Sequence, residues 1–258
     1  MEKADFRVGD ALGQGFGIWF RNFPAFMVLA VLVYAPLIAY TAFVASGTLT
    51  EESQELSTYH MVSGLAQLPL NLLVGAAVLF GAIQQMCGRP ARILASIGVG
   101  LRRLLPVLGV GLLSGLLVGV WLLVAFLPGG DMFLPLALVP CLVLACMFYV
   151  AVPAAMVERP GLLGALRRSR QLTDGYKTRV LGVVLTLGIL TLLVAQLLLG
   201  MFEEGLMTDH QIKVSMWLGL AADIALASLN ASVNAVVYRD LRAARDGTTA
   251  EDLARVFE

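Results

Sequence analysis

Residues 180–202 read VLGVVLTLGILTLLVAQLLLGMF and carry no charged side chain. A helix needs about 20 mostly apolar residues to cross a bilayer, so this stretch predicts a transmembrane helix. The whole chain has the same character: 59% of its 258 residues are hydrophobic and only 14% are charged, against about 45–50% and about 25% in soluble domains. This composition excludes a soluble enzyme of this size and a disordered chain. The net charge of +0 argues against a nucleic-acid partner.

Long windows between successive charged residues place five further spans. Nothing in them alternates with a period of two, as the strands of a membrane β-barrel would. Six such runs leave no polar shell for a soluble fold. We expect an all-α, polytopic membrane helical bundle over residues 1–239, and a cytoplasmic tail with a short helix over 240–258. The predicted transmembrane helices are 24–46, 60–86, 106–127, 133–156, 179–202 and 213–238.

The distribution of basic residues predicts the orientation. Of the 18 Lys and Arg residues, all except Lys213 fall on the side of the predicted spans that holds the N-terminus. Acidic residues such as Glu51, Glu203 and Asp209 fall on the opposite side. The positive-inside rule therefore predicts that both termini are cytoplasmic. The mixed-charge N-terminus is unlike a cleavable signal peptide, so we expect the first span to be retained.

Three cytoplasmic segments separate apolar from basic side chains at helical spacing, at residues 10–23, 91–105 and 160–173. In the last of them, the leucines at 162, 163 and 166 share one face, and Arg167 and Arg168 point away from it. Such helices lie in the membrane interface with arginines near anionic head groups, or they serve only as elbows that orient the next span. Matching Met-x-x-Arg-Pro segments at 86–90 and 156–160 indicate that three elbow-plus-hairpin units repeat along the chain.

Asp223 is the one charged residue deep within a predicted span. An ionisable residue there is costly and is by default a candidate functional site. Asn230 and Asn234 lie on the same face of the last span. The polar residues that reach a comparable depth on other spans, and that we expect as its partners, are Gln67, Asn71 and Gln196. Two interpretations stay open: a neutral or hydrogen-bonded aspartate that fixes helix packing, and a site for a proton or solute.

Small residues and prolines indicate where the spans pack and bend. Gly111, Gly115 and Gly119 recur at four-residue spacing on the third predicted span. Such a face lets two backbones approach closely, within the bundle or between copies of the chain. The fourth predicted span contains three prolines, including Pro153, so we expect it to be the most irregular.

Catalytic and cofactor motifs are absent from the sequence, which contains no Walker A segment, no HExxH and no Cys-x-x-Cys. His60 and His210 fall in the predicted outer loops, where two histidines are more often solvated than bound to a metal. We therefore expect no metal site, no cofactor and no enzymatic activity.

Two stretches carry a family resemblance. ERPGLLGALRRS at 158–169, followed by LTDG at 172–175, resembles the membrane-domain family named for glycerophosphodiester phosphodiesterases, which includes stand-alone bacterial relatives of unknown function. YRDLR at 238–242 is similar to the segment with which such proteins leave their last span. The resemblance implies a six-span protein of the bacterial cytoplasmic membrane. It implies no hydrolase activity, because the family's catalytic domain with its metal-binding carboxylates has no counterpart in this sequence.

The matched charged residues, together with those of the second elbow, predict a cytoplasmic cluster that forms ion pairs and contacts phosphate groups. Its expected members are Arg92, Arg102, Arg103, Glu158, Arg167, Arg168, Arg170, Asp240 and Arg242. These features favour a non-enzymatic inner-membrane protein that organises or handles lipid, or scaffolds a membrane-protein partner, with anionic lipids as expected partners. The alternative is a small-solute or proton-coupled transporter that uses Asp223.

Overall fold

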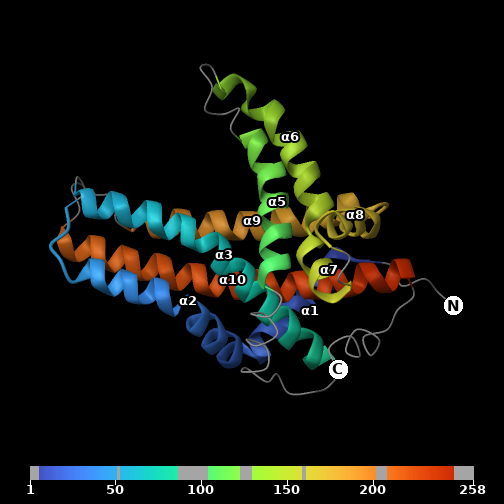
Figure 1. Cartoon of the computed structure of the whole chain (residues 1–258), viewed down its shortest axis with the longest axis horizontal. Coiled ribbons are helices and arrows are strands. Elements are labelled where there is room, and N and C mark those ends of the chain that lie inside the picture. Colours follow the sequence, from blue (N-terminus) through green and yellow to red (C-terminus); the bar gives the residue numbers. More distant parts are fainter. Residues whose placement is uncertain are drawn as a thin grey trace.

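The computed structural model describes residues 6–50, 53–86, 104–122, 130–158, 161–201 and 208–246. Within these ranges the chain is helical and contains no strand (Figure 1). The helices are α1 (Val8–Arg21), α2 (Phe23–Ala45), α3 (Gln54–Met86), α5 (Leu104–Leu122), α6 (Gly130–Phe148), α7 (Ala151–Glu158), α8 (Leu162–Thr173), α9 (Lys177–Gly200) and α10 (Asp209–Asp246).

Five helical segments are long and apolar enough to cross a membrane. They are α2, most of α3, the segment Ala137–Glu158 that combines α6 and α7, α9, and α10. Each coincides with a predicted span. The remaining predicted span, 106–127, overlaps α5, whose apolar part Pro106–Trp121 is shorter, and residues 123–127 lie outside the described ranges. The all-helical prediction is therefore confirmed for the described residues, and the five apolar segments are consistent with a multi-pass membrane protein.

The longest helix, α10, packs mainly against α1, α2, α3 and α9, and more lightly against α7 and α8. With 38 residues it is about 57 Å long, roughly twice the thickness of the hydrocarbon core. It continues to Asp246 without a break, so it crosses the boundary at 239–240 that we predicted between the membrane domain and the tail. The tail beyond 246, with its expected short helix, lies outside the described ranges.

The candidate spans expose many of their large apolar side chains, unlike a helix in the core of a soluble protein. In α9, only Val180, Val183 and Leu187 are buried, although the helix contains 24 residues. Leu193 and Leu197 are 62% and 67% exposed. A water-soluble protein rarely exposes so many large apolar side chains together, whereas lipid chains solvate them without cost. The exposed faces are therefore those expected of a membrane protein.

The α5–α6 hairpin stands crosswise to α2, α3, α9 and α10 (Figure 1). The hairpin contacts α3, α7, α8 and α9, mainly at its base. The glycine stripe of α5 contributes at one position only. A Cβ atom added at Gly111 would lie 2.5 Å from a methyl carbon of Leu72 in α3, whereas Gly115 and Gly119 face open space. The predicted close approach is thus an α5–α3 contact at Gly111.

The fourth predicted span is interrupted at Tyr149 and Val150, between α6 and α7. Pro153 explains the break, because proline has no N–H to donate to the carbonyl four residues earlier and its ring clashes with that carbonyl. The Tyr149 carbonyl instead accepts a 3.1 Å hydrogen bond from Nδ2 of Asn234 in α10. The Met147 carbonyl likewise accepts from the hydroxyl of Ser169 in α8, at 2.7 Å. The irregularity that we predicted for this span is confirmed.

Two of the three predicted elbows are helices: α1 for 10–23 and α8 for 160–173. The second, 91–105, lies outside the described ranges apart from its last two positions, which begin α5. In α8 only Leu166 of the three leucines is buried, and the exposed Leu163 lies on the same helical face as the exposed Arg167 and Arg170, which follow it by four and seven residues. The predicted separation of leucine and arginine faces is wrong here, because α8 packs through Ala165, Leu166, Ser169, Leu172 and Thr173.

The first elbow, α1, docks along the C-terminal half of α10. The indole N–H of Trp19 donates a 2.8 Å hydrogen bond to the Ser228 hydroxyl, and the Ser232 hydroxyl donates to the Gly15 carbonyl at 3.0 Å. Phe20 and Phe23, at the end of the predicted apolar face, remain 66% and 40% exposed. The elbow therefore anchors the chain to α10 and leaves two aromatic rings uncovered.

Candidate functional site

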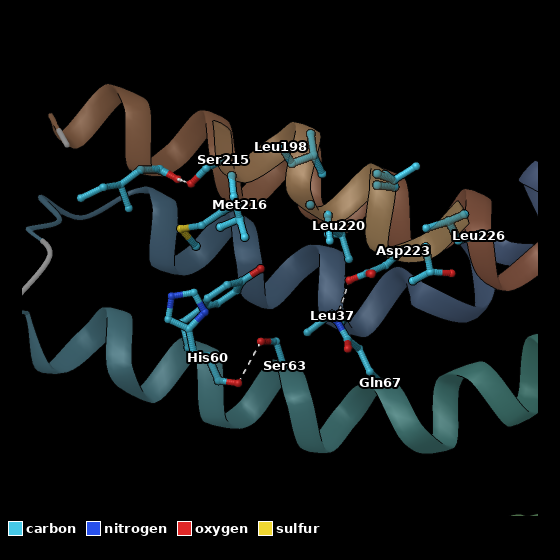
Figure 2. A pocket seen from close by; sticks show the side chains of 18 of the residues that line it. Leu37, His60, Ser63, Gln67, Leu198, Ser215, Met216, Leu220, Asp223 and Leu226 are labelled. Atoms are coloured by element: carbon cyan, nitrogen blue, oxygen red, sulfur yellow. Dashed lines mark hydrogen bonds between the residues drawn. The ribbon is translucent and has the colours of Figure 1, made fainter. Parts of the chain in front are cut away.

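A pocket of about 500 Å³ lies between α3, α9 and α10, with Leu37 of α2 at its back (Figure 2). Its size falls within the range of sites for small organic ligands, about 300–1,000 Å³. Most of its wall is aliphatic. Polar groups come from α3 (Tyr59, His60, Ser63 and Gln67), α9 (Thr191) and α10 (Ser215 and Asp223).

Asp223 and Gln67 close the inner end of this pocket. The side-chain amide of Gln67 donates a 2.5 Å hydrogen bond from Nε2 to Oδ2 of Asp223 (Figure 2). Among the described residues, no Lys or Arg lines the pocket. A carboxylate inside an apolar span is costly, so contact with a neutral amide and with a cavity accounts for its placement. The predicted pairing of Asp223 with Gln67 is the arrangement that the structure shows.

The other predicted members of the intramembrane polar site lie elsewhere. Asn71 accepts a 2.8 Å hydrogen bond from the hydroxyl of Tyr34, and Gln196 is exposed on α9 and does not line the pocket. Asn230 donates to the Leu226 carbonyl of its own helix at 2.9 Å. Asn234 donates its hydrogen bond to the Tyr149 carbonyl at the break between α6 and α7. The polar stripe on α10 is thus divided between a ligand-sized pocket and helix packing.

Sequence reasoning missed the outer part of the pocket. His60 was expected in a loop, but α3 begins at Gln54, so the histidine lies within the helix and lines the cavity. A signal was available, because positions 56, 59, 60, 63 and 67 share one helical face of α3. His60 and Ser63 do not form a nucleophile–base pair, since the Ser63 hydroxyl donates to the His60 backbone carbonyl at 3.2 Å. Among the described residues, no group of three potential metal ligands is found.

A second polar site lies where α7, α8 and the end of α10 meet. Glu158 accepts a 2.6 Å hydrogen bond from Nε of Arg168 and a 2.9 Å bond from the Tyr238 hydroxyl. Arg168 also pairs with Asp246, and Arg242 lies 3.8 Å from Glu158 and 3.9 Å from Asp246. These five residues, which we call the α8–α10 charge network, tie the elbow to the last span.

Within this network, burial alone would lower the pKa of Arg168. Hydrogen bonds and charges from Asp246 and Glu158 outweigh that effect and raise the pKa above its ordinary value. The guanidinium therefore stays charged throughout the neutral range, and its contribution to stability is lost only in strong alkali, as the pH rises through this raised pKa.

The remaining residues of the predicted charge cluster do not join this network. Arg167 and Arg170 are exposed on α8, and Asp240 pairs with its neighbour Arg239 at 2.6 Å. The three arginines of the second elbow, Arg92, Arg102 and Arg103, lie outside the described residues. The structure thus divides the predicted cluster into paired residues, which hold α8 to α10, and exposed arginines.

No family model, curated protein or solved structure matches the chain. The resemblance to the phosphodiesterase membrane-domain family therefore stays a prediction.

Proposed function

We propose that the chain is a non-enzymatic, six-span protein of the bacterial cytoplasmic membrane that handles lipid, binding a single-chain amphiphile between α3, α9 and α10. The pocket carries this proposal. It joins a mainly aliphatic wall to one carboxylate–amide pair at its inner end, and Leu199, which lines it, is 55% exposed at the molecular surface. Ligand sites commonly combine such an apolar lining with a few convergent polar groups.

Charge at the two ends of α10 supports an orientation with both termini in the cytoplasm. Asp209 pairs with Lys213 at one end, and the other end carries Arg239, Arg242 and Arg245. The apolar stretch between them is interrupted only by Asp223. In this proposal the α5–α6 hairpin supplies the third and fourth crossings. It stands crosswise to the other spans in Figure 1, so thiol labelling of the segment between α5 and α6 tests these two crossings directly.

The exposed parts of the elbows support contact with anionic head groups. On α8, Leu163 is 74% exposed beside the exposed Arg167 and Arg170. On α1, Phe20 is 66% exposed next to the exposed Arg21. Apolar side chains that enter the acyl boundary, next to arginines at head-group level, are typical of interfacial helices. Each such arginine contributes about 1 kcal/mol near an anionic surface.

The second candidate function is a proton-coupled or small-solute transporter. The observation that favours it is the setting of Asp223, which pairs with a neutral amide rather than with a cation and faces a cavity. Asp223→Asn separates the two functions. A lipid-binding protein should still retain some ligand through the apolar wall, whereas a proton-coupled transporter should fold and bind but lose coupled uptake.

Filling the pocket tests the proposal. Gly219 lines the pocket, and a Cβ atom added there meets nothing within 4 Å, so Gly219→Leu should occupy ligand space without disturbing the helix. Gly188 offers the matched control, because it is exposed on α9, lies outside the lining and also has free space. Lipids that co-purify in mild detergent are then identified by mass spectrometry.

We expect Gly219→Leu to lose a specific single-chain species that the parent and Gly188→Leu both retain. Equal retention of every co-purified species by all three proteins would contradict the proposed role of the pocket.

A further inference from the structure

The hydrogen-bonding inventory of the pocket identifies the class of ligand, an inference that rests on the proposed function. Each serine and threonine hydroxyl among the described lining residues already donates its one hydrogen to a backbone carbonyl. Ser63 donates to the His60 carbonyl at 3.2 Å, Ser215 to the Ile212 carbonyl at 2.7 Å, and Thr191 to the Leu187 carbonyl at 2.9 Å. Each oxygen therefore faces the pocket as an acceptor.

Tyr59 follows the same pattern. Its hydroxyl oxygen lies 3.3 Å from the hydroxyl oxygen of Thr41. The Thr41 hydrogen is used in a 2.9 Å bond to the Leu37 carbonyl, so Tyr59 is the donor in its contact with Thr41. The phenol oxygen thus also offers only lone pairs to a ligand.

The inner end of the pocket adds the carboxyl group of Asp223. Gln67 satisfies Oδ2 of Asp223, and the structure gives Oδ1 no hydrogen-bond partner among the described residues. The Gln67 carbonyl oxygen is a further acceptor. The donors that remain in the lining are the second N–H of Gln67 and the imidazole of His60. Acceptors therefore outnumber donors in this lining, and no Lys or Arg in the described part of the chain lines the pocket beside Asp223.

We propose that the pocket binds a primary amine attached to a hydrocarbon chain, with the ammonium group between Asp223 and Gln67. A protonated amine supplies three N–H donors and one positive charge, which complements this lining. A phosphate or carboxylate head group would place acceptor against acceptor next to an unpaired negative charge. From Asp223 to Ile212 the pocket follows α10 for 11 residues, about 16 Å of aliphatic wall for the chain.

Native mass spectrometry of the full chain in a maltoside detergent tests this assignment with three probes of equal chain length: dodecylammonium, dodecyltrimethylammonium and dodecanoate. Dodecylammonium should bind at least about tenfold more tightly than dodecanoate, the ratio expected for hydrogen bonds to a charged group. Dodecyltrimethylammonium, which keeps the charge but has no N–H, should bind more weakly than the primary amine. Equal binding of the two cations would overturn the hydrogen-bonding part of the assignment.

Variants test whether the amine binds at Asp223. Asp223→Asn should weaken dodecylammonium binding by about tenfold or more, and Asp240→Asn, a matched change on the same helix outside the pocket, should leave it unchanged. Gly219→Leu, which keeps Asp223, should also abolish binding. Preference for dodecanoate, or unchanged amine binding in Asp223→Asn, overturns the amine assignment while lipid retention in the pocket still supports the proposed function. Failure of every amphiphile to enter the pocket overturns both.

Discussion

The contact between α1 and α10 offers a sharp test of the structure through a single methyl group. Gly15 is buried in α1, and a Cβ atom added there would lie 2.7 Å from a methyl carbon of Val233 and 2.8 Å from its Cα atom. Because one of these atoms belongs to the backbone of α10, rotation of a side chain cannot relieve the contact. Gly15→Ala must therefore push the two helices apart. Gly13, two residues earlier and exposed, has nothing within 4 Å of such an atom.

The expected magnitude follows from comparing the two alanine variants. Alanine in place of glycine within a helix gains about 0.5–1 kcal/mol in both. Only Gly15→Ala carries the overpacking cost, about 1–3 kcal/mol. The difference in the free energy of unfolding between the variants should therefore be about 1–3 kcal/mol. In a chain of this size each kcal/mol lowers the melting temperature by about 2–4 °C.

Thermal unfolding in mild detergent measures this difference. Gly13→Ala should melt at or above the parent temperature, and Gly15→Ala should melt several degrees below Gly13→Ala. Adding Val233→Ala should restore only part of the loss, because that change removes the methyl contact and leaves the contact with Cα. Equal melting temperatures for Gly13→Ala and Gly15→Ala would refute the close packing of α1 on α10.

Three further predictions concern the helix break, the charge network and the topology. Asn234→Ala should cost about 1 kcal/mol, because it leaves the carbonyl at the α6–α7 break without its donor, while Asn230→Ala, whose bond lies within its own helix, should cost little in the same unfolding assay. Arg168→Gln should lower the free energy of unfolding by about 1–2 kcal/mol. The loss should be the same at mildly acidic and mildly alkaline pH, because the raised pKa of Arg168 keeps it charged at both. Arg167 is exposed, so Arg167→Gln should leave the free energy of unfolding nearly unchanged. The topology is tested in a variant without its native cysteines, with an impermeant thiol reagent added to intact cells. A cysteine that replaces Pro128 should react, and one that replaces Arg167 should not. The reverse pattern would contradict six spans with both ends in the cytoplasm.

The helices and the centre of the site could be predicted from the sequence because membrane insertion imposes simple lengths. Charge-free windows placed the apolar helices within a few residues of their observed ends, apart from the first turns of α3 and the last turns of α10. Counting depth from the outer surface gave three candidate partners for Asp223, and one of them, Gln67, is its hydrogen-bond partner in the structure. Pro153 likewise identified the span that breaks.

Features that depend on which helix faces which could not be predicted in this way. Asn71 and Gln196 reach the depth of Asp223, but the first is bonded to Tyr34 and the second is exposed on α9. Depth is a property of one helix, whereas partner choice depends on the rotation and crossing of two. For the same reason, the sequence could not predict that the α5–α6 hairpin stands crosswise to the other helices (Figure 1).

Photocrosslinking measures directly whether the space between α3, α9 and α10 takes up a hydrocarbon chain. A dodecylamine with a diazirine in its hydrocarbon chain is bound to the 258-residue protein in detergent and irradiated. The crosslinked residues are then identified by mass spectrometry of the digested protein. We expect crosslinks at Leu198, Met216 and Leu220, which line the pocket (Figure 2), and we expect Gly219→Leu to lose them. Crosslinks confined to outward-facing positions such as Leu193 and Leu197, unchanged in that variant, would contradict it.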